Sequence, residues 1–207
     1  MTNIFNLVIL LSIITGYSQS QTFPLRTLGI PFGATNYYLK DTYNDFDQFV
    51  GTWKYDNPQT NTSLIIKLKK VIKFYGENSD VYVDCLAGEY IYIENNMEIV
   101  NTIANLNIQS NPYRNNIMGY LMITDNTYPI CPECPEDVIR IKLSFDDPER
   151  EYNSGGMHMW HKTEADGTEK IMIELYYDGL GLRYWEHPTT PNTLRVPYGK
   201  YTLTKIE

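Results

Sequence analysis

Two strand-like runs flank an Asp-Gly pair in the C-terminal third of the chain. Residues 157–164 and 169–177 are rich in Met, Ile, Leu and aromatic side chains, and Asp166 and Gly167 lie between them. An Asp-Gly pair supplies the positive φ angles of a tight hairpin turn, and runs of this composition are typical of the strands that such a turn joins. The segment therefore predicts a β-hairpin and favours an antiparallel sheet.

The same alternation of polar and apolar residues continues over most of the chain. It predicts further strands at 49–55, 63–75, 80–85, 89–94, 97–101, 117–124, 138–145 and 199–206. The chain has 18 Tyr, with 13 Gly and 11 Pro as turn formers, and no segment of useful length has the helical period. We predict an all-β fold, an antiparallel up-and-down β-barrel of about 8–10 strands, with another barrel or a β-sandwich as the alternative.

An apolar run, Ile4 to Ile14, lies near the start of the sequence. It is too short to span a bilayer, and the small residues Ser18 and Ser20 suit a cleavage site, so we predict a signal peptide over residues 1–20. No Lys or Arg precedes the run, so only the α-amino group supplies the usual positive charge. No Cys lies near it, and no later stretch could span a membrane. We expect a secreted or periplasmic protein that is not a lipoprotein.

Prolines and glycines crowd the segment that follows, residues 21–44. Their spacing excludes a helix or a long strand there, so we expect an extended N-terminal arm. The barrel domain is then expected over residues 45–207, and it opens with one helical turn that places Phe46 and Phe49 on the same side.

The charge balance excludes one class of partner. The chain carries 17 Lys and Arg against 25 Asp and Glu, a net charge of −8. A field of this sign repels phosphate backbones, so we expect no nucleic-acid binding. We expect a monomer whose partner protein, if it has one, cannot be read from the sequence.

The segment 45–55, Asp-Phe-Asp-Gln-Phe-Val-Gly-Thr-Trp-Lys-Tyr, carries the most specific motif. It resembles the Gly-x-Trp signature that opens the first barrel strand of the calycins, the group of lipocalins and fatty-acid-binding proteins. Lys54 is similar to the fatty-acid-binding version. Gly51 would let the strand bend, and Trp53 would close one end of the barrel with a large apolar body.

The resemblance also implies a basic side chain from the last strand above the tryptophan. Arg195, Lys200 and Lys205 are the candidates, and a cation over an indole contributes about 0.5–2 kcal/mol. The whole chain further resembles an uncharacterised family of secreted bacterial proteins, in which a signal peptide, Gly-Thr-Trp-Lys-Tyr and a cysteine-rich loop occur in this order. That second resemblance implies no known activity.

Alternating aromatic and thioether side chains occupy several of the predicted strands. They either line a ligand cavity inside the barrel or fill the interior as a solid core. These residues are Tyr90, Tyr92, Met118, Tyr120, Met122, Met157 and Met159.

Two of the three cysteines, Cys131 and Cys134, lie in a proline-rich loop. In an exported protein they predict a local disulfide. A redox-active pair is the alternative, but no helix pattern follows the first cysteine. Cys85 is expected to be a buried thiol, although a bridge from it to either loop cysteine stays open.

The remaining polar groups build no recognisable catalytic or metal site. His158 and His161 fall on opposite faces of a strand, and His187 lies in a loop, so we expect no metal ion and no cofactor. We expect the acidic residues 146–149 to form a solvated turn rather than a calcium site, and residues 153–156 to form a flexible loop.

The function expected from these features is non-catalytic binding of a small hydrophobic or amphipathic molecule by an exported barrel. A structural or protein-interaction domain with a filled barrel is the first alternative. A thiol-disulfide oxidoreductase using Cys131 and Cys134 is the second.

Overall fold

The fold is known from a computed structural model, which describes residues 20–27, 30, 32–76, 80–124, 129–135, 137–150, 153–180, 191 and 193–207. Almost all of the predicted signal peptide, and His187, lie outside these ranges. The elements are β1 (Gln21–Pro24), β2 (Tyr37–Lys40), η1 (Asp47–Phe49), β3 (Gly51–Asn57), β4 (Thr62–Gly76), β5 (Val81–Glu94), β6 (Met97–Asn101), α1 (Asn105–Ile108), η2 (Pro112–Arg114), β7 (Ile117–Ile123), β8 (Arg140–Phe145), β9 (Asn153–Thr163), β10 (Glu169–Leu180) and β11 (Gly199–Lys205).

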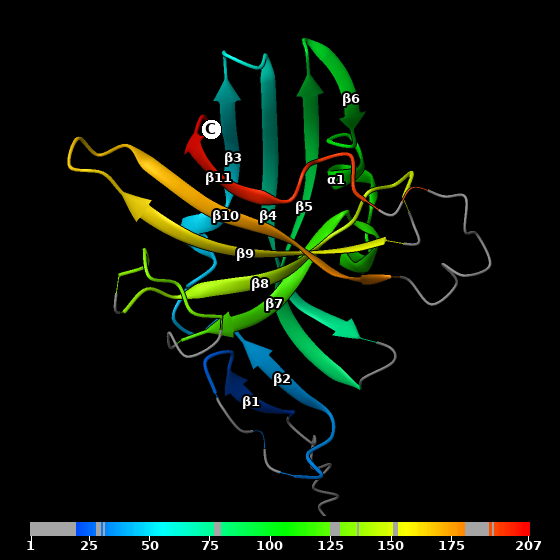
Figure 1. The fold of residues 1–207 in the computed structure, drawn as a ribbon. Helices are drawn as coiled ribbons and strands as arrows, with labels where there is room; N and C mark the ends of the chain where they lie inside the picture. Colours follow the sequence, from blue (N-terminus) through cyan, green and yellow to red (C-terminus); the bar gives the residue numbers. More distant parts are fainter. Residues whose placement is uncertain are drawn as a thin grey trace, which may run out of the picture.

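Eight antiparallel strands close into a barrel (Figure 1). The strands β3, β4, β5, β7, β8, β9, β10 and β11 each pair with the next, and β11 pairs back onto β3. Closure between β5 and β7, where Gly88 lies opposite Ile117, distinguishes the fold from a two-layered sandwich. The predicted antiparallel barrel is therefore confirmed, and its clearest hairpin, β9 with β10, is longer at its open end than the sequence indicated.

One predicted break in the sheet is wrong. The segments 80–85 and 89–94 were expected to be two strands, but they form the single strand β5, which stays paired with β4 through Ala87 and Gly88. A Cβ atom on Gly88 would lie 2.5 Å from Leu68 Cδ2 and 2.9 Å from the Lys67 carbonyl oxygen. The glycine therefore permits close packing inside a continuous strand and does not end it.

The segment 153–156, expected to be a flexible loop, is also strand, and it forms the start of β9. A Cβ atom on Gly155 would lie 2.6 Å from Leu194 Cδ1, and one on Gly156 would lie 2.2 Å from Tyr176 Cζ. Two neighbouring side chains occupy the space above these glycines, which explains how so glycine-rich a segment pairs regularly.

The N-terminal arm is joined to the barrel through two short strands. Strand β1 pairs in parallel with β2, and β2 pairs in parallel with the first residues of β5. Asp84 of β5 fixes this contact, because its carboxylate accepts hydrogen bonds from the Tyr38 hydroxyl at 2.5 Å and from the backbone N–H of Asp41 at 2.9 Å. The arm lies at the lower end of the barrel as drawn in Figure 1.

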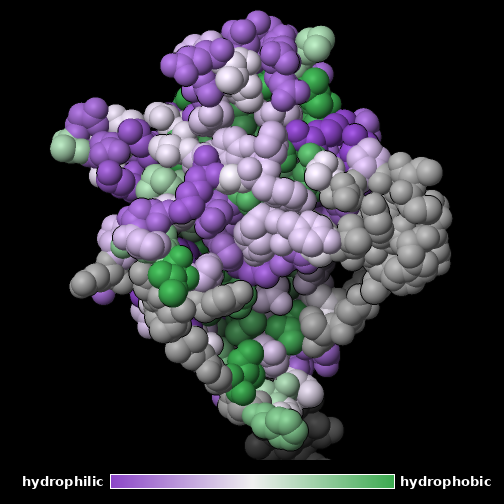
Figure 2. Space-filling view, in the orientation of Figure 1, coloured by the Kyte–Doolittle hydropathy of each residue, from purple (hydrophilic) through white to green (hydrophobic). Residues whose placement is uncertain are grey.

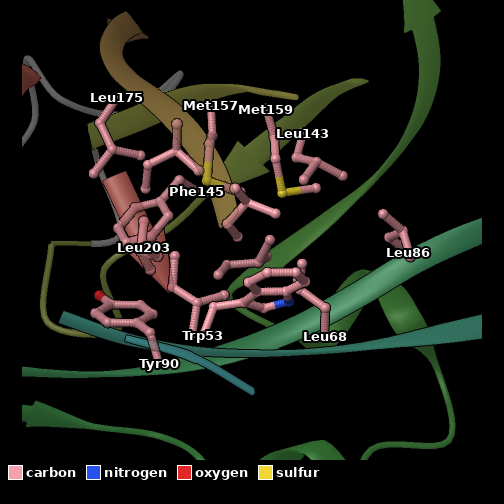
Figure 3. Close-up of a cluster of buried hydrophobic side chains, with 14 of the residues drawn as sticks. Trp53, Leu68, Leu86, Tyr90, Leu143, Phe145, Met157, Met159, Leu175 and Leu203 are labelled. Carbon is pink, nitrogen blue, oxygen red and sulfur yellow. The ribbon is translucent and has the colours of Figure 1, made fainter. Parts of the chain in front are cut away.

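The barrel interior is packed with apolar side chains from every wall strand (Figure 3). Alternate residues of each strand point inward, as the pleat requires. Side chains of this core with no accessible surface include Trp53, Leu64, Ile66, Leu86, Tyr90, Ile117, Ile141, Phe145, Met157, Met159, Ile171, Ile173 and Leu203.

The absence of exposed surface on these side chains also shows how closely they pack against one another. A side chain that bordered a void large enough for a water molecule would keep some exposed surface. The inward-facing residues named above keep none. Around them the barrel is a close-packed core, like the interior of an ordinary globular domain.

Candidate functional site

The Gly-x-Trp motif lies at one end of the packed interior. Trp53 has no exposed surface, and its Nε1 donates a hydrogen bond of 2.8 Å to the Phe49 carbonyl oxygen. Lys205 Nζ lies 5.3 Å from the Trp53 ring centroid. Gly51 has a φ of +134°, and a Cβ atom there would lie 2.5 Å from the Glu207 carbonyl oxygen. The motif thus joins the first barrel strand to the last one.

The three basic candidates for this end of the barrel go to different places. Lys205 is the one that lies over Trp53, and its Nζ also pairs with Glu169 Oε2 at 2.8 Å. Arg195 precedes β11 and pairs with Asp147, and Lys200 pairs with Glu133 in the disulfide loop.

His161 completes the Trp53 end of the core. Its ring meets the rings of Phe49 and Trp53 edge-on, at centroid distances of 6.3 and 6.0 Å. Burial lowers the pKa of His161 and outweighs the opposing charge of Glu169. The neutral ring is therefore favoured, as expected for an imidazole that serves as packing.

The seven residues considered for a ligand cavity are spread over two environments. Five of them belong to the packed core: Tyr90, Tyr92, Met122, Met157 and Met159. Tyr120 is partly buried against that core. Met118 is buried but follows the inward-facing Ile117, so it lies on the outer side of β7.

A separate hollow lies on the outer surface of the barrel, across β7, β8, β9 and β10. The strand registers place Leu121 opposite Lys142, Lys142 opposite His158, and His158 opposite Glu174, so these four side chains form one row across the wall. The hollow has a volume of about 440 Å³, and its other lining residues are Ile123, Pro129, Tyr176 and Asp178.

The front of the molecule in Figure 2 includes this outer wall. Hydrophilic residues cover most of it, and hydrophobic atoms reach the surface in patches in its lower left part. Of the lining residues, Leu121 is 55% exposed. The wall therefore offers polar and apolar surface within one hollow.

An aromatic pair forms the floor of this hollow. The rings of His158 and Tyr176 stack with their centroids 4.5 Å apart and their planes at 22°. Lys142 Nζ lies 5.7 Å from the Tyr176 centroid and 3.5 Å from Asp178 Oδ1. Burial, together with the positive charges of Lys142 and Arg140, lowers the pKa of His158 to about 4. At neutral pH the imidazole is uncharged.

The disulfide loop extends over the outer wall beside this hollow. The predicted disulfide between Cys131 and Cys134 is confirmed. Arg140 Nη1 donates a hydrogen bond of 2.5 Å to the Pro129 carbonyl oxygen, and Glu133 pairs with Lys200 of β11. Trp160 points outward from β9 yet is only 4% exposed, and with Glu133 it lines a smaller hollow of about 150 Å³. The loop therefore lies close to an outward-facing tryptophan.

Cys85, the third cysteine, is free and has no exposed surface. Burial raises the pKa of its thiol to about 12. Because the thiolate is the reactive form, this cysteine is chemically inert at neutral pH.

One expectation about the acidic residues 146–149 is wrong. Asp147 is 1% exposed rather than solvated. Its carboxylate accepts hydrogen bonds from Arg195, from Nη2 at 2.5 Å and from the backbone N–H at 2.9 Å. Asp147 therefore fixes the segment before β11 to the end of β8. In the described part of the chain, no group of three or more His, Cys, Asp or Glu residues could hold a metal ion.

The sequence did not single out the outer hollow, although its residues were visible. Lys142, His158 and Glu174 occupy polar positions of three predicted strands, and such positions ordinarily face solvent. Only the strand registers bring them side by side. The sequence feature that could have indicated this hollow is His158, a weakly polar residue between two inward-facing methionines.

Comparison with known proteins places the chain in a family and gives no activity. Among the described residues, no helix is long and apolar enough to cross a membrane. No curated protein and no solved structure matches the sequence. Kinship with the calycins, which the barrel and the Gly-x-Trp motif suggest, therefore stays a prediction. Residues 1–206 match the model of a family of unknown function, DUF6705, and the chain belongs to that family.

Proposed function

We propose that the protein is an exported, non-catalytic binding domain that uses the outer wall of a filled barrel. The observation that supports this most is the contrast between the two sides of the wall. Inward-facing side chains such as Met157 and Phe145 keep no accessible surface, whereas the outer side carries a hollow of about 440 Å³. Ligand pockets commonly have volumes of about 300–1,000 Å³.

This proposal joins two of the expectations drawn from the sequence. A small amphipathic molecule remains the expected ligand, as in the first expectation. The barrel is a solid scaffold, as in the first alternative, because a long acyl chain would have to displace side chains that are already packed together. Export rests on the apolar run near the start of the sequence and on the disulfide between Cys131 and Cys134.

The test separates an outer site from an interior one. Purified protein is examined by native mass spectrometry and thermal denaturation with a panel of fatty acids and sterols. We expect no lipid inside the barrel and no rise in the melting temperature that is independent of the outer hollow, since the core side chains named above are already packed together. A lipid that raises the melting temperature in a saturable way, and equally in the original protein and in Leu121→Ser, would overturn the proposal.

A matched variant shows that the assay can detect binding inside the barrel. Phe145→Ala removes a ring that has no exposed surface in the core. Apolar cavities of this kind stay dry and bind small apolar molecules such as benzene. We therefore expect benzene to stabilise Phe145→Ala and to leave the original protein unchanged.

The thiol-disulfide oxidoreductase is the weaker alternative. Cys131 is 6% exposed, and the next element after the loop is strand β8 rather than a helix. Catalytic cysteines of that class are accessible and have a lowered thiol pKa, usually at a helix N-terminus. Insulin reduction by the protein that disappears in Cys131→Ser would favour this alternative over the proposal.

A further inference from the structure

The hollow on the outer wall has an apolar side and a polar side. Leu121 and Ile123 of β7, with Pro129 of the disulfide loop, provide the apolar side. Glu174 and Asp178 of β10 provide carboxylates on the other. A ligand that fits both must itself be amphipathic, with an apolar body and one polar end.

The charges in the hollow do not balance. Lys142 Nζ pairs with Asp178 Oδ1 at 3.5 Å and also faces the Tyr176 ring. Among the described residues, Glu174 has no ion-pair partner, because the nearest cation across the strand pair, Lys200, is bound to Glu133. Glu174 is half-buried, so this carboxylate is partly removed from water, and the only cationic side chain opposite it, Lys200, acts on it at a distance while pairing closely with Glu133.

The group opposite Glu174 supplies no charge either. His158 lies directly across from it in the β9–β10 register. Its imidazole is uncharged at neutral pH because burial and two neighbouring cations hold its pKa low. The polar end of the hollow is therefore net negative, in a protein whose total charge is −8.

We propose that this hollow binds small cationic amphipathic molecules. The amine or guanidinium of the ligand pairs with Glu174, and its apolar or aromatic body lies against Leu121 and Ile123 beside the stacked rings of His158 and Tyr176. A cation there gains a charge-assisted hydrogen bond to the carboxylate, while its apolar body is removed from water. The inference rests on the proposed use of the outer wall, and it names the class of ligand.

Three probes with one ring system test the charge requirement. Tryptamine is a cation, tryptophol is its neutral alcohol, and indole-3-acetate is the anion. Binding is measured by calorimetry and by amide chemical shifts in the ¹⁵N-labelled protein. We expect tryptamine to bind about tenfold more tightly than tryptophol, indole-3-acetate to bind most weakly, and the shifts to centre on β7, β9 and β10.

Two variants test the assigned contacts. Glu174→Gln keeps the shape of the side chain and removes its charge, so it should bring tryptamine down to the affinity of tryptophol and leave tryptophol unchanged. Leu121→Ser should weaken both probes, since it removes apolar wall. Glu98→Gln on β6, an exposed carboxylate far along the chain from this wall, is the matched control and should change neither affinity.

Equal affinities for tryptamine and tryptophol would overturn the inference, as would tryptamine binding that Glu174→Gln leaves intact or that Glu98→Gln weakens equally. Absence of saturable tryptamine binding would overturn it too. None of these results touches the proposed function, which fails separately if lipids enter the barrel. If the purified protein carries no lipid and binds none of the three probes, this inference fails, and the proposed outer site must bind a ligand of another class.

Discussion

The inner and outer sides of strands β8, β9 and β10 differ in what their side chains do. Met157 and Met159 point inward and have no exposed surface, while His158 between them points outward into a hollow beside Lys142 and Glu174. These inward residues stabilise the barrel, and they are packed together without exposed surface. The outward residues combine an aromatic stack, charges and apolar contacts in one concave place. Residues adjacent in sequence thus have different roles, the inward ones in stability and the outward ones in the proposed binding. Substitutions on the two sides should therefore affect different properties.

Truncation of the core should have the largest effect. Phe145→Ala is expected to lower the free energy of unfolding by about 3–5 kcal/mol, because a buried ring is lost and a cavity remains. Urea denaturation measures the change. Leu121→Ala, on the outer side of β7, should stay within about 0.5 kcal/mol. Equal losses in the free energy of unfolding at the two positions would show that the inner and outer sides of the wall do not differ in their contribution to stability.

Removing the charge of Asp147 should come next. Asp147→Asn leaves Arg195 largely buried without its main partner and should cost about 3 kcal/mol at neutral pH. Burial alone would raise the pKa of Asp147, but hydrogen bonds from Arg195 and from backbone N–H groups outweigh it and hold the pKa below the ordinary value. Asp56→Asn, which breaks the exposed pair with Lys54, is the control and should cost less than about 1 kcal/mol.

The cost of Asp147→Asn should also depend on pH. A carboxyl whose pKa is lower in the folded state stabilises the protein above its unfolded pKa of about 4, and this contribution is lost as the pH falls through the folded value. The difference between the two proteins in urea should therefore shrink in acid. A difference that stays constant down to pH 2 would mean that the ion pair is not its source.

The disulfide loop tests the outer side by itself. Replacing Cys131 and Cys134 together by Ser should cost about 2 kcal/mol, since the bridge closes a very short loop. The same change should make Trp160 more accessible to solvent. The measurement is iodide quenching of tryptophan fluorescence in a background where the other two tryptophans are replaced by Phe, and the quenching should become stronger. Reduction of the disulfide in that background should reproduce the effect. Unchanged quenching would show that the loop does not shield Trp160.

The smallest effect should be the pH response of His158. Burial and the neighbouring cations lower its pKa to about 4, so between pH 6.5 and 4 the unfolded chain binds a proton that the folded chain does not. Stability should fall as the pH falls through that window. Because the ring is half-buried, we expect a contribution of about 1 kcal/mol. His158→Gln should flatten the slope, and an unaltered slope would assign it to other groups such as His161.

Local sequence patterns predicted the barrel well because they depend on neighbours in the chain. The Asp-Gly turn and the alternation around Met157 and Met159 placed the β9–β10 hairpin correctly. The same reasoning split β5 at Gly88, since a glycine looks alike whether it ends a strand or makes room for Leu68. The local disulfide followed from spacing and composition alone.

Contacts between distant segments could not be predicted in the same way. Asp147 was expected in solvent because its partner, Arg195, lies 48 residues further along the chain. No residue near Asp147 in the sequence indicates that this ion pair forms. The outer hollow depends on the registers of four strands, and a shift of one residue in any of them would turn its side chains inward. Such registers are properties of the closed sheet, so the hollow could be found only after the barrel was known.

Closure of the wall has a consequence for how the protein behaves in crowded solutions. An open sheet ends in unpaired N–H and C=O groups that recruit strands from other molecules, and this is a common beginning of aggregation. All eight wall strands have neighbours on both sides. Within the described residues the outermost strands are β1, four residues long and ending at Pro24, and β6, five residues long with a glutamate in it. Short strands with proline or charge are poor templates, so the architecture itself disfavours fibril growth.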